Sequence, residues 1–244
     1  MDKELRKQIR QDELVTGYES ASAWVTVHQR EVLATLIVAV VGLGGWALLS
    51  HLNATQAAEA EGEFSQALAI FEAPLQAELP QGADKPAGPV FGSAEEKFTK
   101  AAAGFDGVER KWGSLGVGRR ARYFAALCRM ELGQSDPARK ALTEIAARRE
   151  EGALEPYLAQ FAVAELDRRS GPLDKAVDAY RKLADDPALP LPRDHALMTL
   201  GSLLEEAHRL PEARSAYKRL AQEFPASPYA QDAHRRAEYL ATQG

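Results

Sequence analysis

The chain has 244 residues, of which 45% are hydrophobic, 7% aromatic and 27% charged, with a formal net charge of −5 at pH 7. Abundant alanine and leucine with few aromatic residues favour an all-α protein over a β-sandwich or a disordered tail. No basic block able to neutralise many phosphates follows residue 52, so the sequence argues against a nucleic-acid partner.

Residues 32–52 are predicted to form a transmembrane helix. Val32 to Leu49 is a run of eighteen apolar or small residues, which spans roughly 27 Å as a helix, close to the thickness of a bilayer core. A signal peptide is a weaker interpretation because its apolar region is shorter and follows a short, positive segment. A buried core helix is weaker still, because such a helix usually keeps one polar face.

The distribution of lysine and arginine predicts the orientation of this span. Five basic residues precede it, and none follows until Lys85. Positive residues stay on the side from which insertion begins, so residues 1–31 should form a cytoplasmic tail. The remainder then lies across the membrane, which in a bacterium is the periplasm. Four of the basic residues share one face if the tail is helical, and they either contact anionic lipid or only set topology. These four are Lys3, Arg6, Lys7 and Arg10.

Residues 53–92 read as a stalk helix followed by a loop. The helix should run from Ala54 to about Leu75 and carry apolar residues on one face. The segment from Glu78 to Gly92 contains three prolines and three glycines, which do not fit inside a helix. Residues 93–244 then form a compact helical domain.

A pattern inside residues 93–244 repeats four times. It consists of an alanine, a bulky residue four positions later and an aliphatic residue seven positions later, and successive alanines are 37, 38 and 37 residues apart. This period is typical of arrays of helix pairs that bury their apolar faces by stacking. The alanine is expected where the two helices of a pair cross most closely. The four sets are Ala101/Phe105/Val108, Ala138/Leu142/Ile145, Ala176/Tyr180/Leu183 and Ala213/Tyr217/Leu220.

At these residues the sequence resembles the tetratricopeptide repeat, an α-solenoid of helix pairs. The last unit matches best, with Leu197, Leu200, Gly201 and Leu204 on its first helix and Pro225 after its second. Earlier units depart from the pattern. Polar residues there occupy positions that the repeat normally fills with apolar ones, namely Arg122, Arg129, Gln160 and Asp167.

The order of charged tail, single span, stalk, loop and degenerate repeats resembles the ancillary subunit family of the SecYEG translocon. A Phe-Pro-x-Ser-Pro turn at Phe224 to Pro228 is similar to turns of bacterial envelope repeat proteins. The resemblance implies an inner-membrane anchor and periplasmic repeats that assist exported proteins together with a chaperone. The alternative is a structural envelope or cell-division protein that links the inner membrane to the wall machinery.

Resemblance to tetratricopeptide repeats also implies a binding groove on the first helices of the pairs. Methionine and aromatic groups there suit an adaptable surface for peptides, although they could equally pack against neighbouring helices. The residues expected to face the groove are Tyr123, Leu127, Met130, Phe161, Glu165, Arg168, Met198, Ser202 and Glu205.

The sequence gives little support for catalysis, so we expect no enzyme, no cofactor and no metal site. The five histidines lack metal-ligand spacing, and Cys128, the single cysteine, offers no zinc pair. Its simplest interpretation is a small apolar residue in a helix. Adjacent acids such as Glu205 and Glu206 are more simply solvated helix residues than an acid/base pair.

Overall fold

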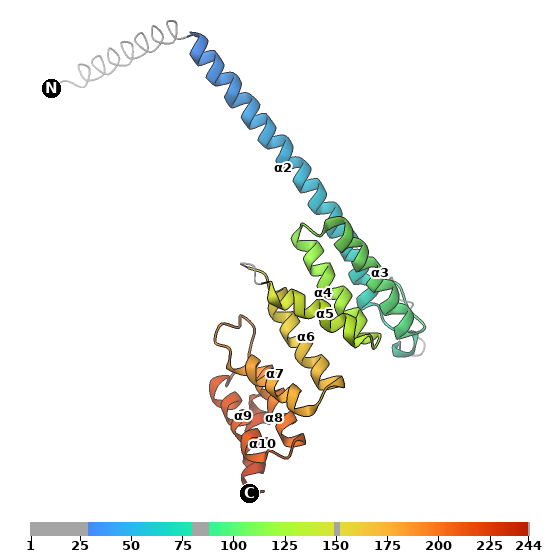
Figure 1. Ribbon diagram of the computed structural model, residues 1–244, viewed down its shortest axis with the longest axis vertical. Helices are drawn as coiled ribbons and strands as arrows, with labels where there is room; N and C mark the ends of the chain where they lie inside the picture. Colours follow the sequence, from blue (N-terminus) through green and yellow to red (C-terminus); the bar gives the residue numbers. More distant parts are fainter. Residues whose placement is uncertain (1–28, 80–87, 149–151, 244) are drawn as a thin grey trace, which may run out of the picture. The chain divides into compact units, whose positions relative to one another are not determined.

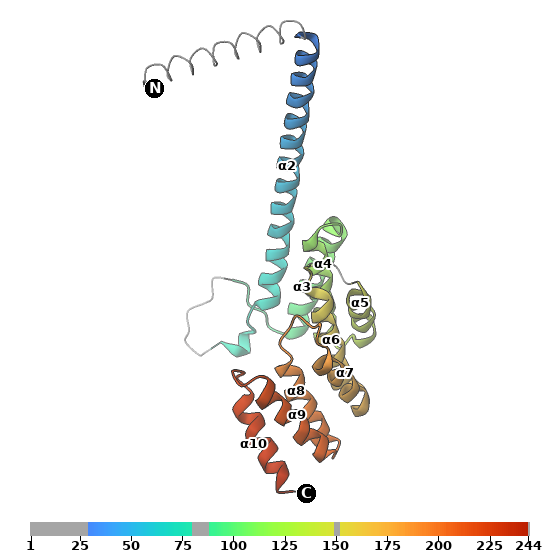
Figure 2. The same ribbon diagram turned by 90° about the vertical axis from the view of Figure 1, so that its left-hand side faces the viewer.

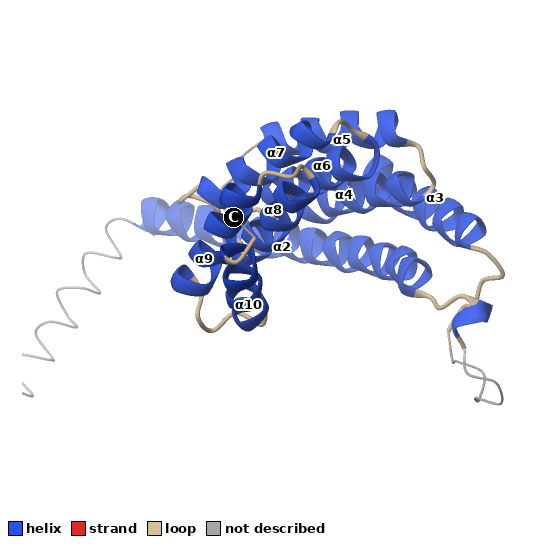
Figure 3. Ribbon diagram, turned by 90° about the horizontal axis from the view of Figure 1, so that it is seen from below, coloured by secondary structure: helices blue, strands red, loops and turns tan. Residues whose placement is uncertain are grey.

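A computed structural model describes residues 29–79, 88–148 and 152–243 (Figure 1). The chain divides into two compact units, residues 1–58 and 59–244. Among the described residues the regular elements are helices (Figure 3). The predicted all-α fold is therefore confirmed.

Helix α2 (Gln29–Glu72) runs through the predicted span and most of the predicted stalk as one helix. No helix among the described residues is long and apolar enough to cross a membrane. The side chains of residues 32–44 and 47–49 lie outside the described set, so the span at 32–52 stays a prediction. The basic face of the predicted tail, Lys3 to Arg10, also falls outside the described residues.

The second unit contains the end of α2 and the helices that follow it. Each helix from α3 onward contacts the next one along the chain, and α8, α9 and α10 lie side by side in Figure 2. The bounds are α3 (Ala94–Trp112), α4 (Gly116–Glu131), α5 (Ser135–Ala147), α6 (Glu155–Ser170), α7 (Leu173–Asp185), α8 (Asp194–Glu206), α9 (Leu210–Glu223) and α10 (Ala230–Ala241), with a short 3-10 helix η1 (Gln76–Glu78) before α3.

The predicted repeat register is confirmed. All twelve residues of the four alanine-based sets are buried, on α3, α5, α7 and α9 in turn. These are the second helices of the pairs, and α4, α6 and α8 are the first helices of the later three. Because the set recurs once per pair, each pair presents the same apolar face to its neighbours.

The end of α2 serves as the first helix of the first pair. Phe64 of α2 lies with its ring centroid 5.5 Å from that of Phe105 on α3 and 5.6 Å from that of Phe124 on α4. Lys111 of α3 donates hydrogen bonds to the carboxylates of Glu59 and Glu63, both at 2.7 Å. The second compact unit begins at Glu59, and these contacts pack the end of α2 against α3 and α4. The predicted division at residue 93 stays a prediction.

The polar residues at normally apolar repeat positions join neighbouring helices. Arg129 of α4 donates two hydrogen bonds of 2.8 Å to Asp106 of α3. Asp167 of α6 is buried, and its Oδ1 lies 2.8 Å from Nη1 of Arg139 on α5. That contact is an ion pair without hydrogen-bond alignment, since Asp167 Oδ1 has no hydrogen-bond partner among the described residues. Removing either charge would leave the other poorly compensated.

Turns at equivalent positions end the first helices of the three later pairs, and two of the three contain a residue with positive φ. Gly133, Gly171 and His208 follow α4, α6 and α8, and they are 38 and 37 residues apart. Gly133 has φ of 72°, and the amide of Gln134 donates to the carbonyl of Arg129 at 2.9 Å, which closes α4 with a Schellman turn. His208 adopts φ of 56° in the same role, although it is not glycine.

Candidate functional site

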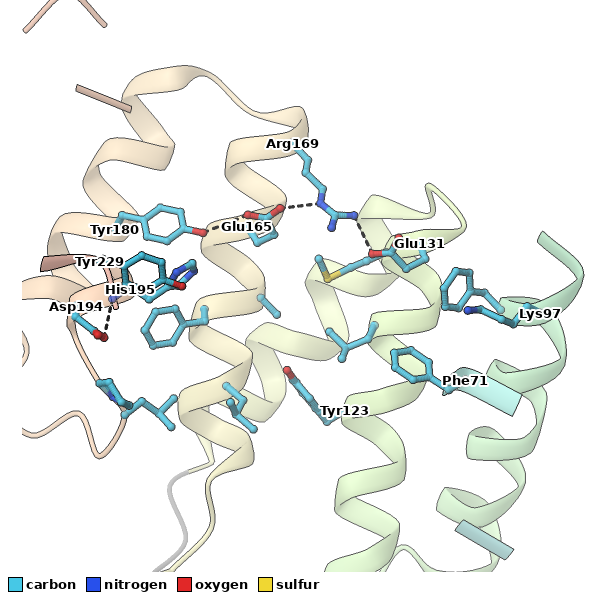
Figure 4. Close-up of a pocket in the computed structure, with 18 residues that line it drawn as sticks. Phe71, Lys97, Tyr123, Glu131, Glu165, Arg169, Tyr180, Asp194, His195 and Tyr229 are labelled. Carbon is cyan, nitrogen blue, oxygen red and sulfur yellow. Dashed lines mark hydrogen bonds and ion pairs between the residues drawn. The ribbon is translucent and has the colours of Figure 1, made fainter. Parts of the chain in front are cut away.

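A groove of about 870 Å³ opens along the first helices of the second unit (Figure 4). Half of its lining residues come from α4 and α6, and one end is formed by residues that precede and begin α8. Its apolar lining consists of Phe71, Phe98, Tyr123, Leu127, Met130, Leu158, Phe161, Ala162, Tyr180, Leu191, Pro192 and Tyr229. Its charged or titratable lining consists of Lys97, Glu131, Glu165, Arg169, Asp194 and His195.

The aromatic core of the first pair supports one end of the groove. Phe71 on α2 contacts Phe98, Phe105 and Phe124, with ring centroids 5.7, 6.3 and 5.5 Å away. Phe71 and Phe98 also line the groove, so the packed rings pass directly into its wall. Edge-on aromatic packing of this kind fixes ring orientation as well as burying area.

One carboxylate on the groove wall, that of Glu165, accepts hydrogen bonds from three side chains. Glu165 of α6 accepts hydrogen bonds from Arg168 at 2.6 and 2.7 Å, from Arg169 at 2.8 Å and from the Tyr180 hydroxyl at 3.2 Å. Arg169 also donates to Glu131 of α4 at 2.9 Å, as the dashed lines in Figure 4 show. Hydrogen bonding by Arg168, the strongest influence, and by Arg169 and Tyr180 lowers the pKa of Glu165 to about 2. This carboxyl is therefore ionised and already paired at neutral pH.

The other charges on the wall are also satisfied by the protein. The Lys97 ammonium donates to the backbone carbonyl of Ala73 at 3.0 Å. Asp194 accepts from the Ser227 hydroxyl at 2.6 Å and from the His195 amide at 2.8 Å. A segment entering the groove therefore meets apolar surface and ion pairs that are already formed, so it gains chiefly apolar contact.

The turn before α10 builds the far end of the groove. The Ser227 hydroxyl that donates to Asp194 also accepts from the Tyr229 amide at 3.1 Å. The His195 ring lies between Tyr229, at 6.1 Å, and Phe161, at 6.3 Å between centroids. Ser227 therefore ties this turn to the start of α8 and holds Tyr229 at the groove.

Tyr123 supplies a hydrogen-bonding group within the apolar part of the wall. Burial raises the pKa of its hydroxyl to about 12. The group stays protonated throughout the physiological range and retains a proton to donate. It lies on α4 in the part of the groove shown at the centre of Figure 4.

The structure brings together five of the nine residues that the sequence predicts for the groove. Tyr123, Leu127, Met130, Phe161 and Glu165 line it. The predicted binding role of these residues stays a prediction, since no ligand is present. The other four residues lie outside it.

Arg168 binds Glu165 but does not line the groove, and its neighbour Arg169 takes that place. Met198, Ser202 and Glu205 of α8 also lie outside it. Glu205 instead accepts hydrogen bonds from the Tyr217 hydroxyl at 2.5 Å and from Arg236 at 3.0 Å. Met198 packs against the core of the later pairs. Equivalent positions on successive first helices therefore do not all line the groove.

Several groove residues were not found from the sequence. Leu191 and Pro192 belong to the connection between α7 and α8, and Tyr229 to the turn before α10. The 37-residue spacing between Ala176 and Ala213, which contains the α7–α8 connection, gave no sign that this connection lines the groove. The Phe-Pro-x-Ser-Pro turn was the one available signal for Tyr229.

Nothing in the described part of the chain groups three or more histidine, cysteine or acidic residues as metal ligands. Cys128 is buried on α4, and burial raises the pKa of its thiol to about 12. The thiol is therefore poorly ionised at neutral pH, which agrees with the interpretation of Cys128 as a small apolar residue.

These features define an array of stacked helix pairs with a groove on its first helices, a class of fold that generally mediates protein–protein interaction and is typically not catalytic. Residues 22–233 match the family described as tetratricopeptide repeat-like domain. The chain belongs to this family. No curated protein matches the chain.

Two similar solved structures contain nearly identical TPR-like repeats of a Podosopora anserina protein described as a candidate kinesin light chain. The first has a TM-score of 0.46 and 11% identity, and the match covers 60% of this chain and 79% of that one. The second, a form of the same protein with one substitution, has the same TM-score and identity, and the match covers 60% and 78%.

Proposed function

We propose that this protein is a membrane-tethered interaction scaffold whose groove holds an apolar, extended segment of a protein partner. The observation that supports this proposal most is the groove of about 870 Å³, with its aromatic and aliphatic lining. Met130 and Leu127 offer side chains that can adapt to different sequences, while Tyr123 can donate a hydrogen bond to an exposed backbone carbonyl.

The paired charges on the wall specify the chemistry of the partner. Glu165, Arg169 and Glu131 bond to one another, so an incoming charged group would have to break these bonds or remain unpaired. An unpaired charge in a partly buried site is costly, whereas an apolar side chain gains free energy from burial. The groove therefore favours segments that are apolar and weakly charged, as unfolded chains expose.

The sequence supports a specific location for this scaffold. Residues 32–52 anchor it in the inner membrane with residues 1–31 in the cytoplasm, and the repeats lie in the periplasm. There the scaffold assists newly exported chains at the translocon together with a chaperone. The support is the apolar run, the distribution of basic residues and the resemblance in architecture. Under the rival proposal, the partners are wall or cell-division proteins.

Site-specific photocrosslinking in native membranes tests this function. The full chain carries a photoreactive phenylalanine analogue at Phe161, in the groove, or at Lys182, an exposed position on α7. We expect adducts with newly exported chains and translocon subunits at position 161 and few at position 182. Equal adducts at both positions would overturn the groove as the binding surface. Adducts with wall synthases or division proteins at position 161 would favour the rival.

A further inference from the structure

A second cavity, of about 450 Å³, lies between α9 and α10 and shares no lining residue with the groove described above. Four residues from each helix form it. They are Arg214, Lys218, Ala221 and Gln222 of α9, and His234, Ala237, Glu238 and Ala241 of α10. The cavity therefore has a floor of three alanines, cations on the α9 side and a carboxylate on the α10 side.

The repeat spacing identifies this cavity as the open face of the last helix. His234, Ala237, Glu238 and Ala241 stand 37 residues after Leu197, Leu200, Gly201 and Leu204. Those residues of α8 are buried, and a methyl group at Gly201 would collide with the Tyr217 ring of α9. In the α8/α9 pair this face is therefore covered by the second helix. On α10, Ala237 is buried and α9 lies across the cavity from this face, but no further helix among the described residues covers the exposed part at His234, Glu238 and Ala241.

The same correspondence between repeats bears on Arg214, whose Nε atom lacks a hydrogen-bond partner among the described residues. In the α5/α6 contact, Arg139 forms an ion pair with Asp167 at 2.8 Å. Arg214 follows Ala213 as Arg139 follows Ala138, and the position equivalent to Asp167 on α10 is Ala241. Within the part of the chain that the structure describes, Nε of Arg214 is buried without a hydrogen-bond partner. A buried polar group in this state needs an acceptor from elsewhere.

The open face itself carries an available acceptor. The Glu238 side chain is 72% exposed and lies 3.6 Å from Nδ1 of His234. Glu238 stands one helical turn before Ala241, on the same face of α10. Arg214 and Lys218, one turn apart on α9, form the opposite side. The same face thus carries both a carboxylate and cations. In a two-fold interface this face meets its own copy, so the carboxylate of each copy can pair with the cations of the other.

We propose that a second copy of this chain covers the open face, with the α10 helices of the two copies packed antiparallel about a two-fold axis. The axis passes between Glu238 and Ala241, so that each Glu238 lies opposite the partner copy's Ala241. Its carboxylate then occupies the place that Asp167 occupies beside Arg139, and it reaches Arg214 and Lys218. The second helix of a pair runs antiparallel to the first, so each α10 takes the place of a second helix on the other. The small side chains of Ala237 and Ala241 permit this close approach.

A mixing experiment with full-length chains tests the proposal. Variant one carries Glu238→Arg, which makes the face uniformly positive, and variant two carries Arg214→Glu and Lys218→Glu, which makes it uniformly negative. Sedimentation velocity in detergent should show that the wild-type chain dimerises and that each variant alone associates at least tenfold more weakly. The mixture should dimerise again, because opposite faces meet. Lys182→Glu, on α7, is the control and should dimerise like the wild type.

A second variant covers the risk that Arg214→Glu perturbs folding. Ala241→Asp places a carboxylate at the position of Asp167, where it pairs with Arg214 inside one chain. This variant should unfold at a higher temperature than the wild-type monomer and dimerise at least tenfold more weakly. The proposal is overturned if the wild-type chain stays monomeric at all concentrations tested. It is also overturned if the dimer tolerates Glu238→Arg and Ala241→Asp unchanged, which would place its interface elsewhere.

Discussion

The spacing between paired helices depends on single small residues. A Cβ atom added at Gly201 would lie 2.4 Å from Cε1 of Tyr217 and 2.6 Å from its Cζ. The Tyr217 ring cannot move away easily, because it is fully buried and its hydroxyl donates to Glu205 at 2.5 Å. Gly104 makes a similar approach in the first pair, where an added Cβ would lie 3.0 Å from Cβ of Ala67.

We predict that Gly201→Ala destabilises the repeats by about 1–3 kcal/mol through overpacking against Tyr217. Gly107→Ala on α3 is the matched control, because nothing lies within 4 Å of a Cβ atom added there. Glycine weakens a helix interior relative to alanine, so the control should gain about 0.5–1 kcal/mol. Urea unfolding followed by circular dichroism measures both. A neutral Gly201→Ala would mean that α8 and α9 are less closely packed than described.

At the scale of helices, ionic contacts join the pairs where apolar packing is thin. Glu165 links α6 to α7 through Tyr180, and Arg169 continues the contact to Glu131 on α4. Similar bonds join the second helices, since Arg181 donates to Glu212 at 2.8 Å and Arg219 to Asp185 at 2.7 Å. Exposed pairs of this kind contribute little individually. The exception is the Glu165 cluster, which consists of Glu165, Arg168, Arg169 and Tyr180. It is partly buried, and we expect it to contribute to stability.

The Glu165 cluster should make stability depend on acid pH. The folded-state pKa of this carboxyl is about 2, against 4.5 for the ordinary group. A lowered folded pKa means that the stabilisation is fully present above about pH 4.5 and disappears as the pH falls toward 2. The difference in unfolding free energy between wild type and Glu165→Gln should therefore be constant from pH 5 to 7 and shrink toward pH 2.

Urea unfolding at several pH values measures this difference. The control is Glu72→Gln, at an exposed carboxyl on α2 for which the described residues provide no ion pair. Its difference from the wild type should be small at every pH. If the Glu165→Gln difference stays constant down to pH 2, the carboxyl is not held by Arg168 and Arg169 in solution.

At the scale of the whole molecule, the distribution of lysine and arginine makes a testable prediction about topology. In a Cys128→Ser background, Glu150→Cys should react with a membrane-impermeant thiol reagent in intact spheroplasts, because the repeats are expected outside the cytoplasm. Val15→Cys should be protected until the membrane is opened. Labelling of position 15 alone would reverse the orientation and remove the periplasmic proposal with it.

The helix pairs could be predicted because their signal is local and repeated. Each alanine-based set of the pattern is a face of one helix, and burial of such a face requires only the nearest neighbours in the stack. Ala213, Tyr217 and Leu220 accordingly lie buried on α9, as their spacing indicated. The contribution of α2 to the first pair was missed, because the loop after residue 78 suggested a separate domain. Five phenylalanines from three helices meet there, and their contacts are distant in sequence.

The composition and the 37-residue period by themselves determined that this chain is an all-α array of helix pairs. Short stretches of sequence specify both the helical periodicity and the stacking of nearest neighbours. Only the tertiary structure decided which side chains form the groove. Met198 packs against the core of the later pairs, and Glu205 bonds to Tyr217 and Arg236, whereas Phe71 and Tyr229 line the wall from parts of the chain far apart in sequence. These positions result from many packed contacts together, so no single repeat specifies them.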